Sequence, residues 1–171
     1  QLDTQVRRVQ ADEKFRIAAG PGLFGVIKRL TDTNGDGSMD KATVFAKDMQ
    51  PCYGIVAAGG GIIALAAPEI IYYADRDGDG VAEVREVLFR NFKTGPLERG
   101  INAPLWSVDG WIYAGRGHGG GEITGPHLPD SVFLPDTDFR FRADGSAIEP
   151  ITGATKTLGF AVTEAGDRFV C

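Results

Sequence analysis

Cysteine and histidine are both scarce in this chain, which limits the metal and redox chemistry that it can carry. Of its 171 residues, two are cysteine (Cys52 and Cys171) and two are histidine. No CxxC or CxxCH pair occurs, so a c-type haem site or a four-cysteine zinc site within the chain is excluded. The two cysteines either form a disulfide in an oxidising compartment or remain free thiols; the sequence leaves both alternatives open.

Basic charge and long apolar runs are scarce as well. The formal net charge of -5 argues against a nucleic-acid surface, which needs a basic stripe. No run of about 18 apolar residues occurs, so we predict no membrane span. Residues 1–14 are polar and charged and lack a signal-peptide pattern. This indicates a cytoplasmic protein, a leader that has been removed, or residues missing for another reason.

Glycine, in contrast, is abundant, and an internal repeat accompanies it. The 24 glycines predict many tight turns, as in all-β folds. The stretch DTNGDGSMD at Asp32 recurs as DRDGDGVAE at Asp75, a lag of 75 − 32 = 43 residues. A glycine-turn hairpin pattern follows each stretch, and a third unit has its acidic turn reduced to ADGS, Ala143 to Ser146. Four short strands in about 40–50 residues are typical of a β-propeller blade.

We therefore predict an all-β fold built from propeller blades of four antiparallel strands. The partial propeller covers residues 15–171, and residues 1–14 form an N-terminal segment. About three to four blades fit this length, whereas propellers typically have four to eight. The expected propeller is incomplete, and the remaining blades belong to a longer protein or to partner chains. The alternative is a β-sandwich whose hairpins are similar by coincidence.

The two acidic turns predict calcium sites. In the pattern Asp-x-Asn-x-Asp-Gly-x-x-Asp, side chains at positions 1, 3, 5 and 9 and the carbonyl at position 7 can surround one cation. All of these ligands are oxygen, which suits calcium. An EF-hand would need an acidic ligand at position 12 and two flanking helices; here position 12 is Thr43 or Glu86, and strand-like residues follow both turns. The alternative is a plain solvated turn. The predicted ligands are Asp32, Asn34, Asp36, Ser38 and Asp40 in the first turn, and Asp75, Asp77, Asp79, Val81 and Glu83 in the second.

Several segments in order resemble the N-terminal propeller of a bacterial family: IKRLTDTNGDGSMDKATVF, GIVAAGGGIIALAAPEIIYYADRDGDG and GINAPLWSVDGWIYAGRGHGGGEI. The family comprises membrane-bound dehydrogenases, or haem-binding-domain proteins, of the planctomycete–verrucomicrobia group. It is related in fold to the quinone-dependent glucose/sorbosone dehydrogenases. The resemblance implies a periplasmic or extracellular location and a c-type cytochrome domain outside this chain. It also implies oxidation of a sugar or alcohol with pyrroloquinoline quinone as cofactor.

For such a reaction the sequence offers few candidate residues. A base is needed to accept a hydroxyl proton, and we assign this role to His118, with Arg116 as an orienting cation; a loop residue bonded to backbone is the alternative. Arg99 and Asn102, in the link from Arg90 to Asn102, are the cofactor-binding candidates, and a solvated link is the alternative. The second functional hypothesis is a non-catalytic extracellular propeller that binds a glycan or a protein.

Overall fold

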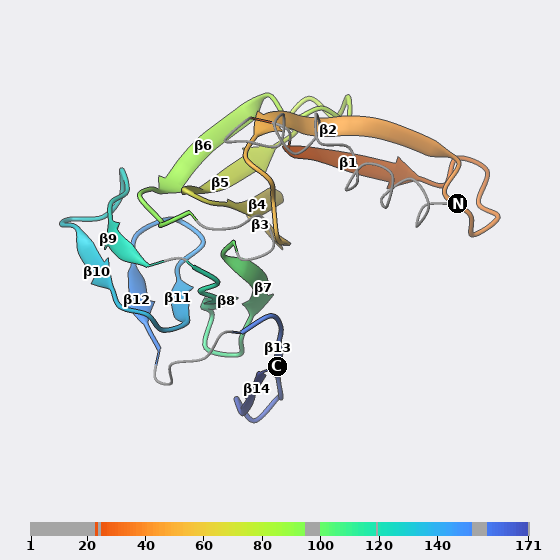
Figure 1. Cartoon of the computed structure of the whole chain (residues 1–171). Helices are drawn as coiled ribbons and strands as arrows, with labels where there is room; N and C mark the ends of the chain where they lie inside the picture. Colours follow the sequence, from red (N-terminus) through yellow and green to blue (C-terminus); the bar gives the residue numbers. More distant parts are fainter. Residues whose placement is uncertain (1–22, 24, 95–99, 119, 152–156, 171) are drawn as a thin grey trace, which may run out of the picture.

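The computed structural model describes residues 23, 25–94, 100–118, 120–151 and 157–170 (Figure 1). Within these ranges the chain forms strands and turns, and no helix long and apolar enough to cross a membrane is found there. The strands are β1 (Gly25–Thr31), β2 (Lys41–Met49), β3 (Ile55–Ala58), β4 (Gly61–Ala66), β5 (Glu69–Ala74), β6 (Val84–Phe89), β7 (Asn102–Trp106), β8 (Ile112–Gly115), β9 (Gly121–Ile123), β10 (Val132–Leu134), β11 (Phe139–Phe141), β12 (Ile148–Pro150), β13 (Phe160–Val162) and β14 (Arg168–Val170).

These strands form two four-stranded sheets and three hairpins. The four-stranded sheets have the orders β3–β4–β5–β6 and β7–β8–β11–β12, and the hairpins are β1–β2, β9–β10 and β13–β14. Every pairing is antiparallel. The described strands close no barrel. The prediction of an all-β, incomplete propeller with four-stranded antiparallel blades is confirmed.

The sheets are out of phase with the repeat unit read from the sequence. In that unit a strand–acidic turn–strand hairpin precedes the glycine-turn hairpin, whereas in the two four-stranded sheets the glycine-turn hairpin comes first and the Asp-Gly turn joins the third and fourth strands. Thus residues 75–83 connect β5 to β6, and each glycine turn connects a first strand to a second, as in β3–β4. The hairpin β1–β2 accordingly corresponds to the third and fourth strands of a sheet. The hairpin β13–β14 corresponds to the first and second strands of another.

One hairpin, inserted between two strands of the second sheet, is absent from the predicted blade pattern. The Asp-Gly dipeptide of the acidic turn recurs at Asp79 and Asp144, a lag of 144 − 79 = 65 residues in place of 43. Much of the extra length is the hairpin β9–β10, which lies between the second strand, β8, and the third strand, β11. Both strands of this hairpin are only three residues long. Their periodicity is too brief to separate from that of a loop.

The sheet β3–β6 is buried on both of its faces. Along β4, Ile63 and Leu65 face the second sheet, whereas Ala64 and the partly buried Ile62 belong to a separate cluster with Ala46 of β2. Successive side chains of a strand point to opposite faces. Burial of both faces therefore accounts for the nearly continuous apolar run from residue 61 to residue 74. The sheets are stacked face to face along the chain, as propeller blades are (Figure 1).

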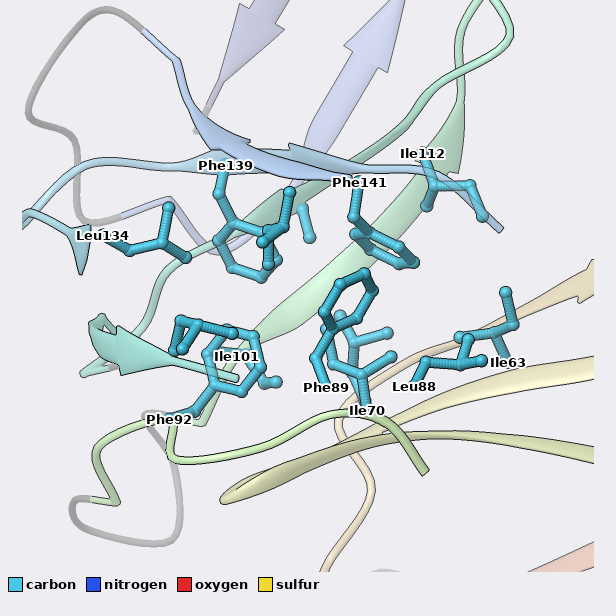
Figure 2. Close-up of a cluster of buried hydrophobic side chains, with 14 of the residues drawn as sticks. Ile63, Ile70, Leu88, Phe89, Phe92, Ile101, Ile112, Leu134, Phe139 and Phe141 are labelled. Atoms are coloured by element: carbon cyan, nitrogen blue, oxygen red, sulfur yellow. The ribbon is translucent and has the colours of Figure 1, made fainter. Parts of the chain in front are cut away.

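Aromatic rings fill the space between the two four-stranded sheets. Figure 2 shows Phe89 of β6 beneath Phe141 of β11, and their ring centroids lie 5.6 Å apart in an edge-to-face arrangement. Phe92, in the link after β6, packs against Phe139 at 5.3 Å. These side chains have relative exposures of 2% or less. The link between the two sheets therefore carries part of the core, and is not wholly a solvated segment.

The contact between β3 and β7 leaves no room for a side chain at Gly54. A Cβ atom there would lie 2.2 Å from Cδ of Pro104 and 3.2 Å from the backbone nitrogen of Ala103. Gly54→Ala should destabilise the fold by about 1–3 kcal/mol, because overpacking forces the two sheets apart. Urea unfolding followed by tryptophan fluorescence would measure the change. Gly54→Ser should cost at least as much, and an unchanged midpoint for both variants would contradict the close packing.

Candidate functional site

The two acidic turns, loop 1 (residues 32–40) and loop 2 (residues 75–83), share one hydrogen-bond framework. In each loop the carboxylate at position 1 accepts the backbone N–H groups of the glycines at positions 4 and 6. The donor–acceptor pairs are Gly35 to Asp32 at 2.7 Å, Gly37 to Asp32 at 2.8 Å, Gly78 to Asp75 at 2.6 Å and Gly80 to Asp75 at 2.9 Å. These glycines have positive φ angles, which glycine adopts without steric cost.

The same framework continues through positions 3, 5 and 7. The side-chain oxygen at position 3 accepts the N–H of position 5, and the carboxylate at position 5 accepts the N–H of position 7. The pairs are Asp36 to Asn34 at 3.0 Å and Ser38 to Asp36 at 2.7 Å in loop 1, and Asp79 to Asp77 at 3.1 Å and Val81 to Asp79 at 2.7 Å in loop 2. The 43-residue repeat is thus a repeat of backbone geometry as well as of sequence.

The acidic residue at position 9 closes each loop onto position 2. In loop 1 the carboxylate of Asp40 accepts the N–H of Thr33 at 3.0 Å and its hydroxyl at 2.7 Å. In loop 2 the carboxylate of Glu83 accepts the N–H of Arg76 at 2.6 Å. Acidic side chains at positions 1 and 9 are therefore both held by backbone donors in the two loops.

The two loops differ in how closely their carboxylates gather. Oxygens of Asp75, Asp77 and Glu83 all lie within 4.8 Å of one another, which is close enough to hold one cation. Among the residues that the structure describes, this is the one such acidic group found. In loop 1, both oxygens of Asp40 accept bonds from Thr33. Loop 2 therefore has the better-formed ligand set, with Asp79 and the Val81 carbonyl outside the three-carboxylate group.

Backbone donors lower the pKa of the position 1 carboxyl in both loops. The N–H groups of Gly37 and then Gly35 lower the pKa of Asp32 below its ordinary value. Burial acts to raise the pKa of Asp75, but the N–H groups of Gly78 and Gly80 outweigh it, so this pKa is also lowered. Negative charge at position 1 is thus favoured in both loops.

The pKa values of the other loop 1 carboxyls are lowered by the same kind of contact. The N–H of Ser38 lowers the pKa of Asp36, and the hydroxyl and N–H of Thr33 lower the pKa of Asp40. The lowered pKa values favour negative charge on all three aspartates of loop 1 and on Asp75 of loop 2. Such a set suits a hard cation, since carboxylate and carbonyl oxygens are the ligands that calcium prefers.

Loop 2 also joins two parts of the fold. Its Ala82 N–H donates to the carbonyl of Phe45 in β2 at 2.8 Å. The guanidinium of Arg29 in β1 lies 3.8 Å from the carboxylate of Asp75. A well-ordered loop 2 therefore supports the contact between the hairpin β1–β2 and the first sheet.

The predicted redox residues lie at one end of the second sheet. Asn102 opens β7 and is paired with Gly115 at the end of β8, directly before Arg116. The amide nitrogen of Asn102 donates to the carbonyls of Gly100 at 3.1 Å and Thr157 at 3.2 Å. The structure thus brings the cofactor candidate Asn102 close to the catalytic candidate Arg116, although 14 positions (116 − 102) separate them in sequence.

A buried carboxylate organises this end of the sheet. Asp138, only 3% exposed, accepts the N–H of Arg116 at 3.0 Å and the hydroxyl of Thr157 at 2.5 Å. The Arg116 guanidinium pairs with Asp136 at 3.0 Å. Sequence reasoning missed Asp138 and Thr157, because 22 and 19 residues separate the members of these bonds and no local pattern marks them.

Both histidines lie in exposed turns. His118 is exposed in the turn after β8, and Arg99 lies outside the described residues. His127, in the turn between β9 and β10, lies 2.6 Å from the carboxylate of Glu86 on β6. Cys52 is a free cysteine whose thiol donates to the carbonyl of Gly54 at 3.1 Å, and Cys171 lies outside the described residues.

Comparison with known proteins gives one family. Residues 10–171 match the family described as Domain of unknown function (DUF7133). No curated protein and no solved structure matches the chain. The match covers nearly the whole sequence and carries no activity with it.

Proposed function

The chain belongs to the DUF7133 family, and we propose that it is a calcium-stabilised β-propeller domain of an exported, dehydrogenase-like protein. The observation that carries the proposal is the gathering of three carboxylates in loop 2 on a framework that loop 1 repeats. Two loops with the same hydrogen bonds, 43 residues apart, are difficult to explain as unrelated solvated turns. A periplasmic or extracellular location would suit this role.

In this proposal Asp75, Asp77 and Glu83 hold the cation of loop 2, with Asp79 and the Val81 carbonyl completing the set. Asp32, Asn34, Asp36, Asp40 and the Ser38 carbonyl do so in loop 1. Bound calcium would offset the mutual repulsion of the carboxylates and fix the turn between the third and fourth strands. Because loop 2 contacts Phe45 and Arg29, its ion would also stabilise the contact of the first sheet with β1–β2.

Isothermal titration calorimetry with calcium tests this directly. We expect about two ions per chain, because the two loops present equivalent ligand positions. Asp77→Ala should abolish the loop 2 site and leave one. The matched control is Asp144→Ala, in the third turn, where the carboxylate accepts the Ser146 N–H at 3.0 Å but has no comparable acidic partners. No binding by the wild-type chain, or two ions still bound by Asp77→Ala, would contradict the assignment.

The pH dependence of calcium binding follows from the lowered pKa values of Asp32, Asp36, Asp40 and Asp75. A carboxyl whose folded pKa lies below its unfolded value contributes to stability above the unfolded value and loses this contribution as pH falls through the folded one. Calcium affinity should therefore change little from pH 7 to about pH 5 and fall steeply below about pH 4. Titrations across this range would measure it. A loss of affinity already complete at about pH 6 would exclude aspartate ligands of this kind.

The convergence of Asn102 and Arg116 favours a second candidate function, oxidation of a sugar or alcohol with pyrroloquinoline quinone. Asn102 would bind the cofactor, together with Arg99. Arg116, positioned by Asp136 and Asp138, would orient an anionic group, and His118 would accept the hydroxyl proton. Bound quinone would supply the hydride acceptor, and a c-type cytochrome domain outside this chain would take the electrons.

Dye reduction after addition of quinone and calcium, with sugars and alcohols as substrates, tests this candidate. A propeller that is only a binding scaffold for glycan or protein would give no turnover while still binding calcium. Activity that Arg116→Ala abolishes and Arg142→Ala leaves unchanged would support the oxidation. Equal loss in both variants, or no activity with the remaining blades supplied, would favour the binding scaffold.

A further inference from the structure

Asn34, at position 3 of loop 1, is followed directly by a glycine. The chain has two other asparagines, Asn91 and Asn102, and these are followed by Phe92 and Ala103. An asparagine side chain can react with the backbone nitrogen of the next residue, and a following glycine has no side chain to shield that nitrogen. Asn34 is also exposed to water, which the reaction consumes. Sequence and exposure therefore single out Asn34 as the asparagine most open to deamidation.

The reaction is a ring closure followed by hydrolysis. The backbone nitrogen of Gly35 loses its proton to the solvent and attacks Cγ of Asn34, and the bond from Cγ to Nδ2 breaks with release of ammonia. Water then opens the resulting succinimide at one of its two carbonyls. Cleavage of the bond from Cγ to nitrogen gives aspartate, whereas cleavage of the original peptide bond gives isoaspartate, whose main chain runs through Cβ. Water is consumed and ammonia is released, so neither an oxidant nor a metal is needed.

The hydrogen bonds of loop 1 engage the atoms that the ring closure needs. The N–H of Gly35 donates to the carboxylate of Asp32 at 2.7 Å. The side-chain amide nitrogen of Asn34, which is the leaving group, donates to the carboxylate of Asp36 at 3.0 Å. The side-chain oxygen of Asn34 accepts the N–H of Asp36, also at 3.0 Å. The attacking nitrogen and the leaving group are thus held by different carboxylates, and these bonds have to break before the ring can close.

The charge of loop 1 opposes the reaction as well. Negative charge develops on the nitrogen of Gly35 as its proton leaves. The N–H of Gly37 lowers the pKa of Asp32 and the N–H of Ser38 lowers the pKa of Asp36, so negative charge is favoured on both carboxyls. These charges raise the energy of a further negative charge on the neighbouring nitrogen. The folded loop therefore slows the reaction both by its hydrogen bonds and by its charge.

Loop 2 shows which product the framework can accept. The repeat carries Asn34 onto Asp77, since 77 − 34 = 43. The Asp77 carboxylate accepts the N–H of Asp79 at 3.1 Å, as the Asn34 side chain accepts the N–H of Asp36 at 3.0 Å. Aspartate at position 3 is therefore compatible with the loop. Isoaspartate is not, because its additional main-chain atom changes the spacing between the N–H donors and the carboxylate at position 1.

We propose that Asn34 is a site of spontaneous deamidation whose rate is set by the hydrogen bond from Gly35 to Asp32. In the folded protein the reaction proceeds during local openings of loop 1, so its rate reports the stability of that loop. The products divide between an aspartate form, which keeps the loop 1 framework, and an isoaspartate form, which breaks it. The reaction needs no bound ion and proceeds in chelator, so it is independent of whether either loop binds calcium.

Peptide mapping by mass spectrometry, after incubation of the full chain in chelator, tests the site. We expect deamidation at Asn34 with a rate proportional to hydroxide concentration, and none at Asn91 or Asn102 over the same period. In urea the hydrogen bonds of the loop are lost, so deamidation at Asn34 should be faster than in the folded chain by about tenfold or more. An unmodified Asn34 in urea, or a faster reaction at either of the other asparagines, would overturn the proposal.

Matched variants test the role of the hydrogen bond. Asp32→Ala removes the acceptor of Gly35 and should speed deamidation of the folded chain by about tenfold, because a hydrogen bond to a charged group is lost. Asp75→Ala makes the same change in loop 2 and should leave the rate at Asn34 unchanged. Circular dichroism would confirm that both variants fold, and in urea both should react at the wild-type rate. An Asp32→Ala rate no higher than that of wild type, or equal acceleration by both variants, would overturn the proposed protection.

Discussion

In saturating calcium the chain should unfold at a temperature roughly 10–20 °C above that measured in chelator. A ligand at 100 times its dissociation constant stabilises the folded state by about 2.7 kcal/mol per site, and two sites act together. For a chain of this size each kcal/mol raises the melting temperature by roughly 2–4 °C. Differential scanning fluorimetry in calcium and in chelator would measure the difference. Identical melting temperatures would mean that both loops are metal-free hairpin turns.

Loop variants separate a metal effect from a folding effect. Asp36→Ala and Asp79→Ala should each lower the melting temperature in calcium and change it little in chelator, because each removes a ligand at position 5. Asp144→Ala should change neither value in a calcium-dependent way. A loss of equal size in calcium and in chelator would show that the carboxylate acts through the loop hydrogen bonds alone, such as the bond from Val81 to Asp79.

The two loops should not contribute equally. Loop 2 donates to Phe45 and contacts Arg29, so its ordering extends to the hairpin β1–β2. Burial does not distinguish the loops, because in each of them the position 1 aspartate is half-buried and the other four ligand residues are exposed. We therefore expect Asp79→Ala to lower the melting temperature in calcium more than Asp36→Ala does. The reason is the position of loop 2 in the fold, since the ligand types of the two loops are nearly the same.

Local geometry was the part of this structure most predictable from sequence. The bonds within each acidic loop join residues two to seven positions apart, so a nine-residue motif contains nearly all of the information. The strand Phe139–Phe141 is local in the same sense, because its two aromatic residues alternate with an arginine, as is typical of a half-buried strand.

Long-range features were less accessible. The repeat unit has no intrinsic starting point, so the sequence could not show that sheets begin at the glycine-turn hairpin. The short strands of β9–β10 carry too few residues for a periodicity. Asp138 was missed because its two partners, Arg116 and Thr157, are distant in sequence and meet it only after β8 and β11 have paired.

The second large expected effect is the loss of stability when an aromatic ring is removed from the core between the two four-stranded sheets. Phe89→Ala should destabilise the fold by about 3–5 kcal/mol, because it removes a fully buried ring and leaves a cavity that two stacked sheets cannot readily close. Total stabilities of domains are about 5–15 kcal/mol, so the variant should be folded in calcium and largely unfolded in chelator. Urea titrations in both conditions would measure this.

The partner ring and an exposed ring provide the controls for this prediction. Phe141→Ala should cost a similar amount, and the double variant should cost less than the sum, because the two rings contact each other at 5.6 Å. Phe133→Ala removes a ring that is 65% exposed and should change stability by about 0.5 kcal/mol or less. A Phe89→Ala variant as stable as Phe133→Ala would mean that the two sheets do not pack through these rings. The stacking of blades on which the propeller assignment depends would then be wrong.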